Sequence, residues 1–127
     1  MDNTMALLLS DTYKQCHDRM YPNGLTKLVS YWVPRKSMLE NQNEMVFFGL
    51  QAFIKEYLMG YFQKNFFDLS EDEMLTLYTD SMDVQIGRDN YDLDKIVELH
   101  RLGYLPLEIR ALPEGTLVPM GVPCIEI

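Results

Sequence analysis

Cysteine is scarce in this chain of 127 residues, which contains only Cys16 and Cys124. The two lie far apart in the sequence and form no C-x-x-C pair, so neither a disulfide framework nor a cysteine zinc site is indicated. A reducing compartment fits this usage. The acidic residues also lack the spacing of a calcium-binding loop. The sequence therefore predicts no metal ligands.

Basic residues and long apolar runs are also in short supply. There are 11 Lys and Arg residues against 19 Asp and Glu, which gives a formal net charge of −8 and a pI near 4.6. This balance argues against nonspecific nucleic-acid binding, which needs clustered cations. No run approaches the ~20 apolar residues of a membrane span, and the run Met5–Leu9 lacks the basic flank of a signal peptide. We therefore expect a soluble, cytoplasmic domain with no nucleic-acid or membrane partner.

The common enzyme signatures are absent too. The sequence has no P-loop, no G-x-G-x-x-G, no H-E-x-x-H and no G-x-S-x-G. His17 and His100 have no carboxylate or cysteine partner at ligand spacing, and residues of this kind are more often helix-surface or capping residues than catalysts. No catalytic residue is assigned within the chain.

What is present indicates a single α+β domain. Ser70-Glu71-Asp72-Glu73 reads as a capping box at the start of a helix that ends near Gly87. Further helices are predicted over about 11–20, over about 43–57 with Gly60 as its end signal, and over about 92–101 with Gly103 as its end signal. Ten acidic and two basic residues fall in 68–98, so this stretch is expected to form solvated helix faces.

Strand patterns occupy the rest of the chain. Residues 25–33 alternate and are rich in β-branched and aromatic side chains. Short strands over 107–112, 116–118 and 124–127 are separated by Pro113-Glu114-Gly115 and Pro119-Met120-Gly121. The expected fold is about four helices with a small, mainly antiparallel sheet. The sequence ends inside an apolar strand, and we expect the chain to be the opening piece of a longer polypeptide.

The segment Asp11-Thr12-Tyr13-Lys14-Gln15-Cys16-His17 gathers a carboxylate, an aromatic ring, a cation and an imidazole within two helical turns. Tyr13 and His17 lie four residues apart and share a helix face. One interpretation is an N-capped amphipathic helix with an exposed salt pair. The other is an aromatic platform beside polar groups that could hold a flat heteroaromatic ligand.

Asp11-Thr12-Tyr13-Lys14-x-x-His17, followed by Tyr21-Pro22, resembles the opening motif of the nicotinamide phosphoribosyltransferase family. Four further blocks agree with that family in the same order: Tyr31-Trp32-Val33-Pro34-Arg35, Val46-Phe47-Phe48-Gly49-Leu50-Gln51, Leu105-Pro106-Leu107-Glu108-Ile109-Arg110-Ala111, and Pro113-Glu114-Gly115 with Pro119-Met120-Gly121. The five blocks span about residues 8–127. The stretch from about 61 to 100 agrees only in helical character.

The resemblance implies a pentosyltransferase of NAD salvage, which transfers phosphoribosyl from phosphoribosyl pyrophosphate to nicotinamide and so forms nicotinamide mononucleotide and pyrophosphate. It implies a homodimer with the site at the subunit interface. Tyr13 would stack on the pyridine ring bound to the partner subunit, Asp11 would lie in the same pocket, and Arg35 would contact phosphates. Magnesium is expected with phosphoribosyl pyrophosphate in the full enzyme, and no cofactor is expected in residues 1–127.

In that family an α/β barrel carries the catalytic histidine and most phosphate-binding residues, and it would follow Ile127. The chain alone is therefore expected to be inactive. Two alternatives stay open: a nicotinate phosphoribosyltransferase of the same architecture, and a non-catalytic binding or oligomerisation module on this scaffold.

Overall fold

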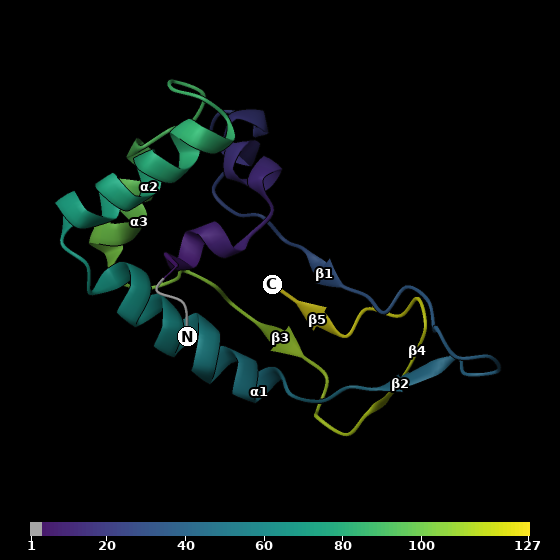
Figure 1. Cartoon of the computed structure of the whole chain (residues 1–127). Helices are drawn as coiled ribbons and strands as arrows, with labels where there is room; N and C mark the ends of the chain where they lie inside the picture. Colours follow the sequence, from purple (N-terminus) through teal and green to yellow (C-terminus); the bar gives the residue numbers. More distant parts are fainter. Residues whose placement is uncertain (1–3) are drawn as a thin grey trace. The chain divides into compact units, whose positions relative to one another are not determined.

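The structure, a computed structural model, describes residues 4–127, and the chain divides into two compact units. The helical unit comprises residues 4–24 and 54–105, and the sheet unit comprises residues 25–53 and 106–127. Each unit thus combines two separate stretches of sequence. Together the elements form the α+β fold that the sequence predicts, with antiparallel strand pairs (Figure 1).

The helical unit surrounds one buried cluster. Its elements are the 3₁₀ helices η1 (Ala6–Leu9) and η2 (Thr12–Met20), the π-helical segments η3 (Ile54–Tyr61) and η4 (Gln63–Phe67), and the α-helices α2 (Glu71–Gln85) and α3 (Asp94–Leu102). The buried side chains of the cluster are Met5, Ala6, Phe66, Met74, Tyr78 and Met82. None of the helices in the described residues is both long enough and apolar enough to cross a bilayer.

The helix α2 follows its sequence signals closely. The Ser70 hydroxyl accepts a hydrogen bond from the Glu73 amide at 3.3 Å, and the Glu73 carboxylate accepts one from the Ser70 amide at 3.2 Å. This capping box satisfies amides that the helix itself leaves unpaired. Met74, Tyr78 and Met82 recur every four residues and are buried. The predicted capping box is confirmed.

The sheet unit contains two small antiparallel sheets (Figure 1). In the first, β5 (Ile125–Glu126) lies between β1 (Tyr31–Trp32) and β3 (Arg110–Ala111). In the second, β2 (Glu44–Val46) pairs with β4 (Leu117–Pro119). Phe47, Val118 and Cys124 form the core of this unit. All three predicted C-terminal strands are present, but β3 covers only Arg110–Ala111 of the strand predicted over 107–112.

Three sequence predictions differ from the structure. The helix expected over 43–57 is wrong at its start, because residues 44–46 form β2; the helix α1 (Leu50–Phe53) begins only after Gly49. Gly60 does not end a helix either, since it lies inside η3. The strand expected over 25–33 is paired with another strand only at β1 and through Ser30. The strand β4 that pairs with β2 lies far away in the sequence, where local periodicity gives no information.

An ion pair between α2 and α3 makes the helical unit sensitive to acid. Arg101 donates two hydrogen bonds of 2.8 Å to the Glu71 carboxylate, and these bonds hold the pKa of Glu71 below its ordinary value of 4.5. A lowered pKa in the folded state contributes stability above the unfolded pKa, and that stability is lost as the pH falls through the folded value. We expect the Glu71→Gln variant to show a weaker decline of Tm than the wild type as the pH falls below about 4.5.

Thermal unfolding followed by circular dichroism between neutral pH and about pH 3 measures this decline. The Arg101→Gln variant is the matched control, because it removes the donor and keeps the carboxyl group. In that variant the Glu71 carboxyl should titrate at a higher pH in a carbon-detected NMR experiment. An unchanged Glu71 midpoint would contradict the assignment.

Candidate substrate-binding site

Tyr13 lies in η2 with its side chain largely in solvent, at 62% relative exposure. The His17 ring lies 5.4 Å from the Tyr13 ring, centroid to centroid, at an interplanar angle of 55°. The Lys14 ammonium is 5.9 Å from the Tyr13 ring centroid and 3.6 Å from the Asp11 carboxylate. The structure thus brings Asp11 and Tyr13 together around Lys14. An exposed ring with a carboxylate beside it suits a flat, electron-poor heteroaromatic ligand.

Hydrogen bonds from Gln15 fix η2 within the helical unit. Its side-chain amide nitrogen donates to the Leu7 carbonyl at 2.7 Å and to the Ser10 hydroxyl at 2.6 Å. Its side-chain oxygen accepts from the Tyr78 hydroxyl at 3.2 Å, and Thr12 donates to Gln85 at 2.6 Å. These bonds join η2 to α2, so the exposed Tyr13 ring stands on an anchored backbone.

Arg35 lies in the sheet unit, just after β1. The preceding Pro34 is buried, and its carbonyl accepts a hydrogen bond of 2.7 Å from the Gly121 amide. Gly121 has a φ of +85°, a conformation that side-chain-bearing residues rarely adopt. This bond joins two of the sequence blocks and fixes the backbone next to Arg35. The Arg35 side chain is exposed, and within residues 4–127 it makes no hydrogen bond or ion pair.

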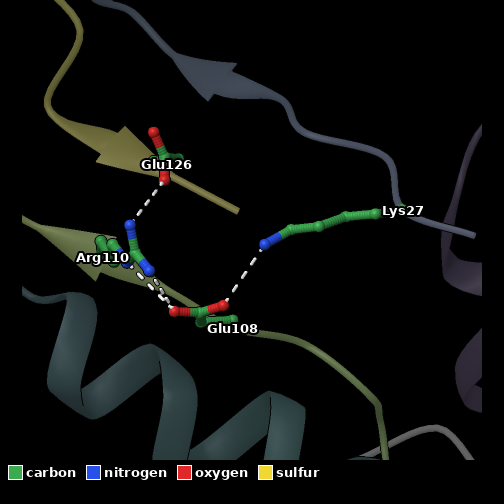
Figure 2. Close-up of polar contacts among 4 residues, drawn as sticks. All are labelled: Lys27, Glu108, Arg110 and Glu126. Carbon is green, nitrogen blue, oxygen red and sulfur yellow. Dashed lines mark hydrogen bonds and ion pairs between the residues drawn. The ribbon is translucent and has the colours of Figure 1, made fainter.

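A second polar cluster in the sheet unit escaped the sequence analysis: Lys27, Glu108, Arg110 and Glu126 (Figure 2). Arg110 donates to one Glu108 oxygen at 2.6 and 3.1 Å and lies 3.6 Å from Glu126. Lys27 lies 3.5 Å from the other Glu108 oxygen. The hydrogen bonds from Arg110 lower the pKa of Glu108, and the same bonds raise the pKa of Arg110. The spacing Glu108-x-Arg110 on one strand face is the signal that could have revealed the pair.

The two arginines of the sheet unit therefore differ in what they can bind. The Arg110 guanidinium is already neutralised by two carboxylates, whereas no described carboxylate neutralises that of Arg35. A free guanidinium fork is suited to phosphate oxygens. Of this pair, Arg35 is the one available to an anionic ligand.

The cysteines and acidic residues of the described chain form no metal centre. Cys16 and Cys124 are both free thiols, and burial raises the pKa of Cys124. Across residues 4–127, no three His, Cys, Asp or Glu side chains gather closely enough to hold a metal ion.

Comparison with known proteins assigns the family. The family described as "Nicotinamide phosphoribosyltransferase, N-terminal domain" matches residues 5–109. A nicotinamide phosphoribosyltransferase of Acinetobacter baylyi (strain ATCC 33305 / BD413 / ADP1) is 38% identical over 122 residues, which cover 92% of this chain and 24% of the relative. The chain thus spans about a quarter of the length of that relative. The chain belongs to the nicotinamide phosphoribosyltransferase family and contains the N-terminal domain of that family.

Proposed function

We propose that this chain is the N-terminal part of a cytoplasmic enzyme that transfers phosphoribosyl from phosphoribosyl pyrophosphate to nicotinamide. The products are nicotinamide mononucleotide and pyrophosphate. The observation that carries the proposal is the family match over residues 5–109, together with a relative named for this activity. Because the chain covers 24% of that relative, the catalytic groups are expected to lie outside residues 1–127.

The chain's own contribution to the reaction is binding. Tyr13 stacks on the pyridine ring, and its exposed face supports this role. Asp11 lies in the same pocket, where its carboxylate can accept a hydrogen bond from the amide of nicotinamide. Arg35 contacts phosphate oxygens through a guanidinium that has no described protein partner. We propose that these residues face the site of a second subunit in a head-to-tail homodimer.

Turnover assays on two lengths of the protein test this proposal. Protein expressed from the whole reading frame should form nicotinamide mononucleotide from nicotinamide, phosphoribosyl pyrophosphate and magnesium, and the purified chain 1–127 should not. Turnover by the short chain would contradict its purely binding role. A full-length protein that binds nicotinamide without turnover would favour a non-catalytic module.

Nicotinate is the second candidate substrate, and the position of Asp11 argues against it. Nicotinate carries a carboxylate, and a second carboxylate in the same pocket repels it. We expect a higher kcat/KM for nicotinamide than for nicotinate. In the Asp11→Asn variant, the ratio of kcat/KM for nicotinamide to kcat/KM for nicotinate should be smaller. The substitution removes the repelling charge and preserves the shape of the side chain.

Arg35→Ala should selectively weaken the binding of the phosphorylated substrate. Loss of a charge-assisted hydrogen bond to phosphate is expected to raise the KM for phosphoribosyl pyrophosphate by roughly tenfold, with the KM for nicotinamide unchanged. Steady-state kinetics with each substrate varied in turn measures both constants. Lys36→Ala is the matched control, because it removes one positive charge from the adjacent exposed position. If both variants raise the KM for phosphoribosyl pyrophosphate equally, Arg35 contributes only a positive charge and is not a specific phosphate ligand.

A further inference from the structure

One side of the helix η2 faces solvent, and the other is bound to the rest of the helical unit. Tyr13 and Lys14 are on the exposed side, with Asp11 directly before the first turn. Four other side chains contact α2 or the turn 86–90 that follows it, and we call them the anchoring residues: Thr12, Gln15, Cys16 and Arg19. Spacings of three, four and seven residues place side chains on one side of a helix. Helix η2 therefore has a ligand side and an anchored side.

Gln15 makes the most contacts among the anchoring residues. The contacts of Cys16 and Arg19 are long, at 3.8 and 3.4 Å. Thr12 donates one hydrogen bond of 2.6 Å. The amide group of Gln15 donates twice, at 2.6 and 2.7 Å, and its oxygen accepts once, at 3.2 Å. Both kinds of polar atom in the Gln15 side chain are thus used to hold η2.

The groups that Gln15 binds belong to the buried part of the helical unit. Tyr78 is 1% exposed, and its ring packs edge-to-face against that of Tyr91 at 5.8 Å. Leu7 lies in η1 and packs against the same buried cluster as Tyr78. Gln15 itself is half-buried. Its side chain therefore connects η2 to the core of this unit at two points.

Gln15 is also close to Tyr13 along the chain. The Lys14 amide donates to the Asp11 carbonyl at 2.9 Å, which closes the first turn of η2 around Tyr13. Gln15 is the next residue, so its side-chain hydrogen bonds hold this turn in place. Stacking requires a defined ring geometry, and a displacement of about 1 Å in a binding group can remove much of its effect.

We propose that Gln15 is a positioning residue for nicotinamide: its three hydrogen bonds hold the turn that carries Tyr13 in the position needed for stacking. This role rests on the proposed function, in which Tyr13 stacks on the pyridine ring. The contacts select glutamine. A glutamate could not donate to Leu7 and Ser10, and a methionine of similar length lacks both the amide donors and the oxygen.

Steady-state kinetics of the Gln15→Met variant, in protein from the whole reading frame, tests the positioning role. The KM for nicotinamide should rise roughly three- to tenfold, because the turn that carries Tyr13 is no longer held. The KM for phosphoribosyl pyrophosphate should stay near that of the wild type, since Arg35 belongs to the other unit. Gln63→Met is the matched control: it removes a 2.7 Å hydrogen bond to Asp68 that does not involve η2, and it should change neither constant.

A double-mutant cycle separates positioning from a general loss of stability. In the Tyr13→Ala background, Gln15→Met should leave the nicotinamide KM unchanged, because no ring is left to position. A further rise by the same factor would overturn the proposal. Tyr78→Phe is a second single variant, which removes the hydroxyl that donates to Gln15 and keeps the ring in the buried cluster. It should raise the nicotinamide KM by a smaller factor than Gln15→Met, because the two bonds donated by Gln15 remain.

Amide hydrogen exchange measures the same effect without substrate. The Lys14 amide should exchange about tenfold faster in Gln15→Met than in the wild type, because its hydrogen bond to the Asp11 carbonyl opens more often. The Val97 amide, which donates to the Leu93 carbonyl at the start of α3, is the internal control. Equal Lys14 exchange in the two proteins would overturn the proposal.

Comparison of the two single variants at Tyr13 and Gln15 shows which conclusion fails. If Tyr13→Ala raises the nicotinamide KM and Gln15→Met does not, the positioning role of Gln15 alone is wrong. If Gln15→Met speeds Lys14 exchange but neither variant changes the nicotinamide KM, the stacking role in the proposed function is wrong, and the positioning role fails with it.

Discussion

Replacing Tyr13 with alanine is expected to raise the KM for nicotinamide by roughly 5- to 150-fold, which corresponds to the loss of about 1 to 3 kcal/mol of stacking. The ring is 62% exposed, so its removal leaves no cavity in the helical unit, and stability should change little. The KM for phosphoribosyl pyrophosphate should stay near that of the wild type. Steady-state kinetics and nicotinamide titration on protein from the whole reading frame measure these quantities.

Two variants make the Tyr13 experiment specific. Tyr13→Phe keeps the ring and should retain most of the affinity, which separates stacking from any role of the hydroxyl. Tyr104→Ala removes a similarly exposed tyrosine, at 57%, from a position outside the site and should leave both KM values unchanged. If Tyr13→Ala and Tyr104→Ala have the same nicotinamide KM, the stacking role is wrong.

The largest effect on stability is expected at Phe66. Its side chain is fully buried, and its ring lies 4.9 Å from that of Phe67 and 5.4 Å from that of His100, both in edge-to-face geometry. Phe66→Ala removes these contacts and opens a cavity that the surrounding helices cannot fill completely. We expect a loss of about 3 to 5 kcal/mol in the free energy of unfolding. Urea denaturation followed by circular dichroism measures this loss.

Phe48→Ala is the matched control for Phe66, because the same atoms are removed from a side chain that is 79% exposed. Its free energy of unfolding should stay within about 0.5 kcal/mol of the wild type. A change below about 1 kcal/mol in Phe66→Ala would show that the buried cluster repacks, and the central place of Phe66 in that cluster would then be wrong.

Helix α2 shows which part of the fold is predictable from sequence. Ser70 and Glu73 sit three residues apart, and the capping contacts between them need no other segment of the chain. Gly103 ends α3 in a left-handed conformation with φ +77°, again as a local event. These two boundaries depend only on neighbouring residues and were predicted correctly, whereas the local end signal at Gly60 was wrong.

The start of the helix predicted over 43–57, which depends on a distant partner, was predicted wrongly. Residues 44–46 have helical periodicity with the residues after them, yet they form β2 because Leu117–Pro119 lies beside them. The candidate site follows the same division. Asp11, Tyr13 and Lys14 come from one segment and lie close together, whereas the contact of Lys27 with Glu108 joins residues that no local pattern connects.

The central position of β5 also dictates the order in which the sheet unit can form. Tyr31 pairs with Glu126, and the intervening stretch 54–105 belongs to the other unit. During synthesis the helical unit is complete once residue 105 has left the ribosome, while β1 and β2 still wait for β4 and β5. Pairings this distant in sequence close slowly and leave strand edges exposed in the meantime. The nascent chain therefore passes through a stage in which β1 and β2 have been made but their partner strands have not.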